Sequence, residues 1–168
     1  MNNEKTEASD PNPAPKRRGF ELDLHGGEPS ERVWLDYENE NGGDCKLVLH
    51  LRGRQIIAQD WSFWHALIAI RKEIEQEGLI PICYGTSLDV WPSGMCCDAG
   101  GWLAYYMHED NERRKVCIFE TGPEVIPSTI QDQQAYCMDM LEHCSEDSSG
   151  ILRRKRKRGN KQKPATQQ

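Results

Sequence analysis

The chain has 168 residues, of which 37% are hydrophobic, and its formal net charge at pH 7 is −6. This length suits one domain and is short for two. No apolar run approaches the roughly 18 to 20 residues that cross a bilayer, and the N-terminus has acids and prolines where a secretory signal has an apolar region. We therefore expect a cytoplasmic protein with no membrane partner, in which the seven cysteines are reduced thiols.

The charge is divided unevenly along the chain. Residues 153–163 contain eight basic residues and no acid, so the rest of the chain carries −14. Such a tail fits nonspecific binding of an anion such as nucleic acid, an import-like address, or a contact with the acidic body. A solubilising tail is the plain alternative. The predicted anion-binding residues are Arg153, Arg154, Lys155, Arg156, Lys157 and Arg158.

Three segments of different composition follow one another. Residues 1–30 mix Pro, Gly, Asn and charge, and they are predicted to form a disordered N-terminal arm. Within this arm, alternation of apolar and polar residues at 20–26 allows a short edge strand or a partner-docking segment. A single α+β domain is predicted for 31–145, followed by a disordered basic tail at 146–168.

The domain is predicted to begin with a hairpin and a helix. Residues 33–37 and 45–51 have strand patterns, and the Asn-Gly-Gly between them suits a tight reversal. Apolar residues at helical spacing predict the main helix over 61–78. Asp60 is its expected N-cap and Gly78 its expected left-handed C-cap.

Four short strands and a second helix are predicted next. The strands lie at 79–85, 87–91, 101–107 and 115–120, and the last two are expected to form a hairpin over 102–119. The helix is predicted within 126–144, with Pro127 at its start and Ser128 or Thr129 near its cap. Its expected buried side consists of Ile130, Gln134, Cys137 and Leu141.

This order of elements predicts the fold class. We expect an α+β domain with an antiparallel sheet of about five to six strands, one main helix packed on a face, and a second, C-terminal helix.

The stretch "YGTSLDVWPSGM" at 84–95 ends in a candidate binding loop, which continues to residue 101. Pro92 should end a strand, because it cannot donate to the ladder, and Pro-Ser-Gly predicts a turn, after which Met95 re-enters the core. A structural corner explains the same glycines and proline without a ligand. The candidate loop consists of Trp91, Ser93, Gly94, Met95, Asp98, Gly100 and Gly101.

The pattern "YG…DVWPSGM…GG…AY…IFE", over about 84–120, resembles an uncharacterised bacterial protein family with a G-x-x-x-D-V-x-P-S-G-M motif. The motif corresponds here to residues 85–95, and the resemblance spans roughly a fifth of the chain. It implies a shared fold core and no known activity.

A cysteine-based site is the catalytic alternative for the region 93–108. A reactive thiol needs a base or a positive environment that lowers its pKa, and neither His108 nor His65 has a spacing that aligns it with a cysteine. Burial in the core is the other interpretation of these cysteines. Paired zinc-ligand spacings are missing, so no metal and no cofactor are predicted. The candidate catalytic residues are Cys96, Cys97, Asp98 and His108.

The sequence thus predicts a small intracellular binding protein without catalysis, whose acidic body engages a basic protein. An immunity-like or inhibitory role is one form of this hypothesis. One alternative is a nucleic-acid-associated protein that uses the basic tail, and another is an enzyme of unknown class with the cysteine site.

Overall fold

The computed structural model describes residues 18–28, 31–39, 44–107 and 114–142. Four sequence-based predictions fall outside these ranges. They concern the first 17 residues of the predicted arm, the Asn-Gly-Gly reversal at 41–43, the basic tail at 146–168 with its anion-binding residues, and the candidate catalytic residue His108.

A five-stranded antiparallel sheet, in the order β4-β3-β2-β1-β5, forms one side of the molecule. The predicted first hairpin is confirmed, because Tyr37 pairs with Leu47 and Trp34 with His50. Alternate residues from Cys45 to Leu51 are buried, as the period of two requires. The strands are β1 (Gly19–His25), β2 (Arg32–Asn39), β3 (Cys45–Leu51), β4 (Arg54–Asp60) and β5 (Ile80–Pro81).

Two strands of this sheet differ from the predictions. Strand β1 pairs with β2 on one side and with β5 on the other, so it is an inner strand and the sheet begins at Gly19, ahead of residue 31. Strand β4 is absent from the predicted elements, because three consecutive apolar residues hide its alternation. Ile56 and Ala58 are buried, whereas Ile57 between them is 59% exposed.

A second, three-stranded sheet has the order β6-β7-β8 and consists of β6 (Val90–Trp91), β7 (Leu103–Tyr106) and β8 (Lys115–Cys117). The antiparallel pairing of β7 with β8 confirms the second hairpin. The predicted strands at 79–85 and 87–91 shrink to β5 and β6, because the 3-10 turn η2 (Tyr84–Thr86) lies between them. The α+β class is confirmed, with the strands divided between two sheets.

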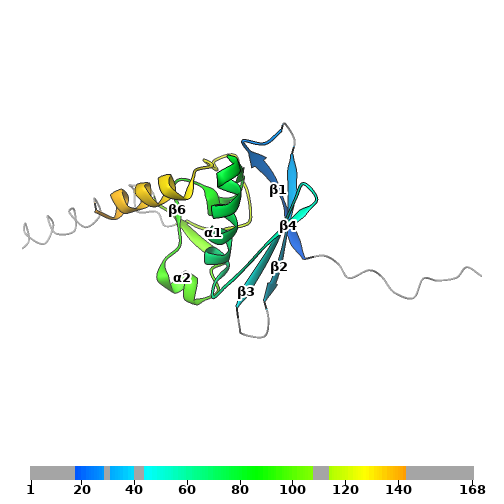
Figure 1. Cartoon of the computed structure of the whole chain (residues 1–168). Coiled ribbons are helices and arrows are strands. Elements are labelled where there is room, and N and C mark those ends of the chain that lie inside the picture. Colours follow the sequence, from blue (N-terminus) through cyan, green and yellow to red (C-terminus); the bar gives the residue numbers. More distant parts are fainter. Residues whose placement is uncertain (1–17, 29–30, 40–43, 108–113, 143–168) are drawn as a thin grey trace, which may run out of the picture.

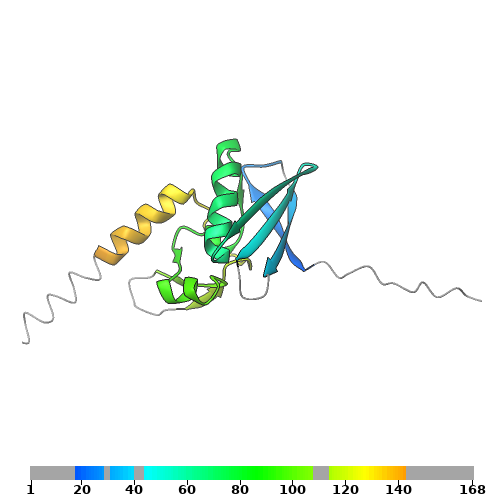
Figure 2. The ribbon, with the colours of Figure 1, turned by 60° about the horizontal axis from the view of Figure 1, so that its bottom comes forward.

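Helix α1 (Phe63–Ile74) lies between the five-stranded sheet and the remaining elements, as both views show (Figure 1, Figure 2). The 3-10 turn η1 (Glu75–Glu77) continues it to Gly78, whose φ of 75° confirms the predicted left-handed cap. The predicted N-cap is wrong. Asp60 ends β4 and accepts a hydrogen bond from the Trp61 N–H, whereas the Ser62 hydroxyl accepts the N–H of His65.

Five aromatic rings join the two sheets across the start of α1. They come from β1, β2, α1, the entry to β7 and the segment after β8, and neighbouring centroids lie 4.6 to 6.2 Å apart. Such tilted and edge-on contacts add to the free energy of burial. The rings are those of Phe20, Tyr37, Phe63, Trp102 and Phe119.

The C-terminal helix spans residues 130–142 in the described chain. Thr129 caps it, since its hydroxyl accepts the N–H of Asp132. The predicted buried side is wrong in part, because Gln134 is exposed and Leu141 is 48% exposed. Gln133, Cys137 and Met140 are buried instead. No helix in the described ranges combines the length and apolarity that a membrane span needs.

Candidate functional site

The motif segment 85–95 begins inside the molecule. A Cβ at Gly85 would lie 2.6 Å from a Leu67 methyl carbon and 3.0 Å from the Ile118 carbonyl oxygen, so a larger residue would displace its neighbours. Two residues on, the Ser87 hydroxyl donates to the Asp89 carboxylate (2.8 Å) and accepts the N–H of Ile126 (3.1 Å). The first half of the motif is therefore a packing element that fixes the chain ahead of the C-terminal helix.

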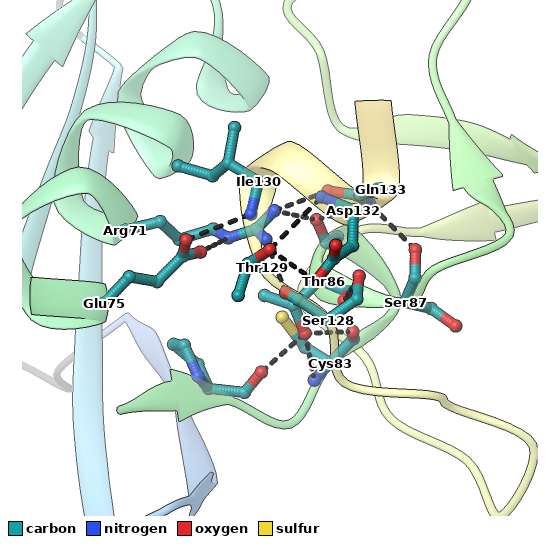
Figure 3. A network of polar contacts seen from close by, with 12 residues as sticks. Arg71, Glu75, Cys83, Thr86, Ser87, Ser128, Thr129, Ile130, Asp132 and Gln133 are labelled. Carbon is teal, nitrogen blue, oxygen red and sulfur yellow. Dashed lines mark hydrogen bonds and ion pairs between the residues drawn. The ribbon is translucent and has the colours of Figure 1, made fainter. Parts of the chain in front are cut away.

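Arg71 is fully buried and is the centre of a polar network (Figure 3). Its Nη1 donates to the Gly85 carbonyl (3.1 Å) and to Gln133 Oε1 (2.6 Å), and its Nη2 donates to the Ser128 carbonyl (2.8 Å). Its Nε donates to Glu75 Oε1 at 2.8 Å. Every guanidinium nitrogen thus has a protein acceptor, which is what a buried charge requires.

Burial lowers the pKa of Arg71, and the Glu75 carboxylate opposes this effect. The second oxygen of the same carboxylate accepts the N–H of Ile130 at 3.0 Å. A carboxylate at this position satisfies one unpaired N–H of the C-terminal helix and interacts favourably with its dipole. Glu75 therefore connects the end of α1 to the start of the C-terminal helix.

Gln133 completes the network from the C-terminal helix. Its Nε2 donates to the carbonyl oxygens of Ser87 (2.8 Å), Val90 (3.0 Å) and Gly85 (3.3 Å). These bonds hold the helix against the motif, and the bonds of Arg71 hold both against α1. The donors of Arg71 and Gln133 all bond to acceptors of the protein itself. The network therefore joins α1, the motif segment and the C-terminal helix, and it does not present the guanidinium to a substrate.

The second half of the motif differs from its predicted conformation. Pro92 follows the last residue of β6, as predicted. The expected turn is the start of a short helix, α2 (Gly94–Asp98), which Ser93 caps by accepting the N–H of Cys96. Gly94 is helical with open space around it, so it has no special backbone role. The expectation for Met95 is wrong, because its side chain is 81% exposed.

The two glycines after α2 have positive φ angles. Gly100 has φ of 96° and Gly101 has φ of 73°. The Gly100 carbonyl accepts the N–H of Phe63 at 2.9 Å, and a Cβ at Gly101 would lie 2.9 Å from the Trp64 nitrogen. These glycines pack the loop against the start of α1. The structural-corner interpretation explains them without a ligand.

The candidate catalytic cysteines lie on α2. Cys97 is buried, Cys96 is half-buried, and the neighbouring Asp98 is exposed. Ser62 lies beside them, although its sequence position does not suggest it. Its hydroxyl shares a 2.7 Å hydrogen bond with the Nδ1 of His65 and also forms a hydrogen bond with the Cys97 thiol. Only the fold brings the β4–α1 junction to α2, so no sequence spacing could reveal this contact.

The ionisation of the buried thiols Cys83, Cys97 and Cys137 does not favour a nucleophile. Burial raises the pKa of Cys97, and the bond from Ser62 only partly opposes it. Burial likewise raises the pKa of Cys83 to about 11 and that of Cys137 to about 12. Because the thiolate is the reactive form, such thiols react slowly. The described residues contain no cluster of three or more metal-ligating side chains.

The described residues include more acidic than basic side chains. Over these residues acids outnumber bases by 18 to 9, and six of the bases already form ion pairs with carboxylates, so the surplus charge is negative. The six paired bases are Arg32, Lys46, Arg52, Arg54, Arg71 and Arg114.

The outer side of helix 130–142 combines this acidity with apolar exposure. Met138 is 53% exposed and Leu141 is 48% exposed. Asp132, Asp139 and Glu142 are exposed on the same helix, whose described residues include no base. The sequence pattern does not predict this surface, because it places Leu141 on the same side of the helix as the buried Cys137. We call these five residues the acidic helix face.

Comparison with protein-family models finds none that matches the chain, and a search of curated proteins finds no relative. The resemblance to the bacterial motif family therefore stays a prediction.

Proposed function

We propose that the protein is a small binding protein without catalytic activity that engages a basic protein partner, with an inhibitory or immunity-like role as one form. The observation that carries this proposal is the presence of exposed carboxylates beside exposed apolar side chains on the acidic helix face. Carboxylates steer a basic partner toward the face and disfavour acidic ones, and desolvated apolar side chains supply affinity.

The helix geometry supports a continuous contact surface. Met138 and Leu141 are three residues apart, and so are Asp139 and Glu142, so each pair lies together on the helix. Helix α2 repeats the combination on a smaller scale, with Met95 at 81% exposure and the exposed Asp98 three residues later. The predicted binding loop at 91–101 thus contributes an exposed methionine and carboxylate, while Gly101 packs against the start of α1.

Affinity purification from cells that naturally express the protein tests this proposal. The full chain should retain a basic partner at moderate salt, and Met138→Ser with Leu141→Ser should weaken the purified complex by about tenfold or more, since buried apolar contacts are lost. Asp139→Asn with Glu142→Gln should chiefly slow association and flatten its salt dependence.

Gln76→Ser is the control, because Gln76 is exposed, carries no charge and lies on η1, outside helix 130–142. Its complex should bind as the unmodified chain does. Recovery of no specific partner, or of one that binds the Met138 and Leu141 double variant with unchanged affinity, would contradict the proposal.

A further inference from the structure

The two edges of the five-stranded sheet are very different. Strand β5 is an edge of two residues and contains Pro81, which cannot donate to a further strand. Strand β4, the opposite edge, has seven residues, and Gln55 to Gln59 include no charge, Pro or Gly. Among the described residues β4 pairs with β3 alone. It therefore lacks the features that usually prevent an edge strand from pairing with another chain.

The sequence of β4 is complementary to itself when two copies run antiparallel. In the register with full overlap, Ile57 stands opposite Ile57 of the second copy and Gln55 opposite Gln59. In the same register Arg54 stands opposite Asp60, so opposite charges meet at both ends of the pair. We propose that β4 is a homodimer interface, at which two copies of this chain join their sheets edge to edge about a twofold axis through Ile57.

The exposed side chains of β4 support this register. Ile57 is 59% exposed in one chain, and the pairing would cover it with its own symmetry mate. Just beyond the strand, Trp61 is 51% exposed, and the same register extended by one residue brings it opposite Gly53 of the second copy. A side chain at Gly53 would meet nothing within 4 Å, so there is open space at that position.

The charges of the single chain are compatible with the pairing. Arg54 forms an ion pair with Glu77 of its own chain, and in the dimer its guanidinium would lie between this carboxylate and that of Asp60 from the second copy. The acidic helix face lies on other residues, so the proposed dimer is independent of the proposed function.

Sedimentation equilibrium of the full chain tests the dimer. The unmodified protein should approach twice the chain mass of 19.3 kDa as its concentration rises. Ile57→Lys places two like charges opposite each other and removes the apolar contact, so it should weaken dimerisation by about tenfold or more. Because the side chain is exposed in one chain, the fold should persist, which circular dichroism checks.

Val48→Lys is the matched control. Val48 on β3 pairs with Ile57 on β4, so it lies on the same face of the sheet but one strand away from the edge. A lysine at position 48 should therefore leave the dimer intact. Arg54→Asp should weaken the dimer through repulsion from Asp60, and Arg54→Asp with Asp60→Arg should restore it.

Three outcomes would overturn the proposal. The first is a chain that stays monomeric at every concentration at which it is soluble. A chain whose β4 pairs with a strand of another protein, and never with a second copy, belongs to the same outcome. The second is a dimer that Ile57→Lys leaves unchanged. The third is a dimer that Val48→Lys disrupts equally, which would place the contact on the sheet face.

Discussion

The two sides of helix α1 are held by different interactions. Toward the five-stranded sheet the contacts are apolar, with Leu47, Leu49 and Leu51 of β3 at most 1% exposed. Toward the motif and the C-terminal helix, α1 contributes the buried Arg71, which bonds to carbonyls and to Gln133 (Figure 3). Apolar contacts such as that of Trp64 with Trp91 also occur on this second side, so the same helix packs by apolar area alone toward the sheet and adds directed hydrogen bonds toward the motif.

The difference determines how each side responds to substitution. Apolar packing has no preferred direction, and its loss costs the transfer free energy and the cavity left behind. A buried charged network costs most when it is broken in part, because the remaining groups stay buried without partners. The apolar side should thus lose stability in proportion to the volume removed, and the polar side should lose the docking of one specific helix.

The largest effect is expected for Arg71→Met. The substitution leaves the Ser128 carbonyl and Gln133 Oε1 without their donor and leaves the Glu75 carboxylate near the core without its cation. The free energy of unfolding should fall by roughly 3 to 5 kcal/mol, the cost of breaking a buried ion pair. Urea denaturation measures it, and amide exchange should show helix 130–142 opening before the five-stranded sheet.

The double variant Arg71→Met with Glu75→Gln sharpens this comparison. It removes the uncompensated carboxylate charge and keeps an oxygen that can accept the Ile130 N–H. It should therefore recover about 1 kcal/mol or more of the loss. If Arg71→Met costs less than about 1 kcal/mol, the network does not hold the helix in the manner described.

Leu49→Ala is the matched substitution on the apolar side. Leu49 is fully buried in the core cluster, and its truncation should cost about 3 kcal/mol in the free energy of unfolding. No hydrogen bond is lost, so exchange at helix 130–142 should rise only with global unfolding. A selective opening of that helix in Leu49→Ala would erase the distinction between the two sides.

The same distinction explains what the sequence predicts well. The alternation in β3 and the helical period of α1 come from apolar burial, and both elements lie where the pattern places them. The left-handed cap at Gly78 is predictable because this backbone conformation favours glycine, and Gly100 and Gly101 also have positive φ angles.

The residues on the polar side of α1 are not predicted by the pattern of apolar residues in the sequence. Apolar periodicity places Leu141 on the buried side of the helix. In the structure, Gln133 donates hydrogen bonds to three carbonyl oxygens, so the helix is oriented with this glutamine buried. A single-sequence pattern counts a buried glutamine as a surface residue. Likewise, the contact of Ser62 with Cys97 depends on tertiary structure, and Ser93 resembles a turn residue until its hydroxyl is seen to cap α2.

The smallest effects are expected at the helix caps, where the same substitution can be made on both sides. Ser62 is fully buried and its hydroxyl serves both the N–H and the Nδ1 of His65. Among the described residues, the Thr129 hydroxyl bonds to Asp132, at a partly exposed position. Removal of a cap costs about 0.5 to 2 kcal/mol, and we expect Ser62→Ala near the upper end and Thr129→Ala near the lower.

The reason for this order is access to water. At Thr129, solvent can replace the hydroxyl as a partner for the Asp132 N–H and carboxylate, whereas at Ser62 the imidazole loses a buried partner. Thermal unfolding of the two single variants and the double variant measures both costs, and the two should add because the caps share no partner. Equal losses would show that burial does not distinguish the caps, and a larger loss for Thr129→Ala would mean that the C-terminal helix depends on its cap more than on the Arg71 network.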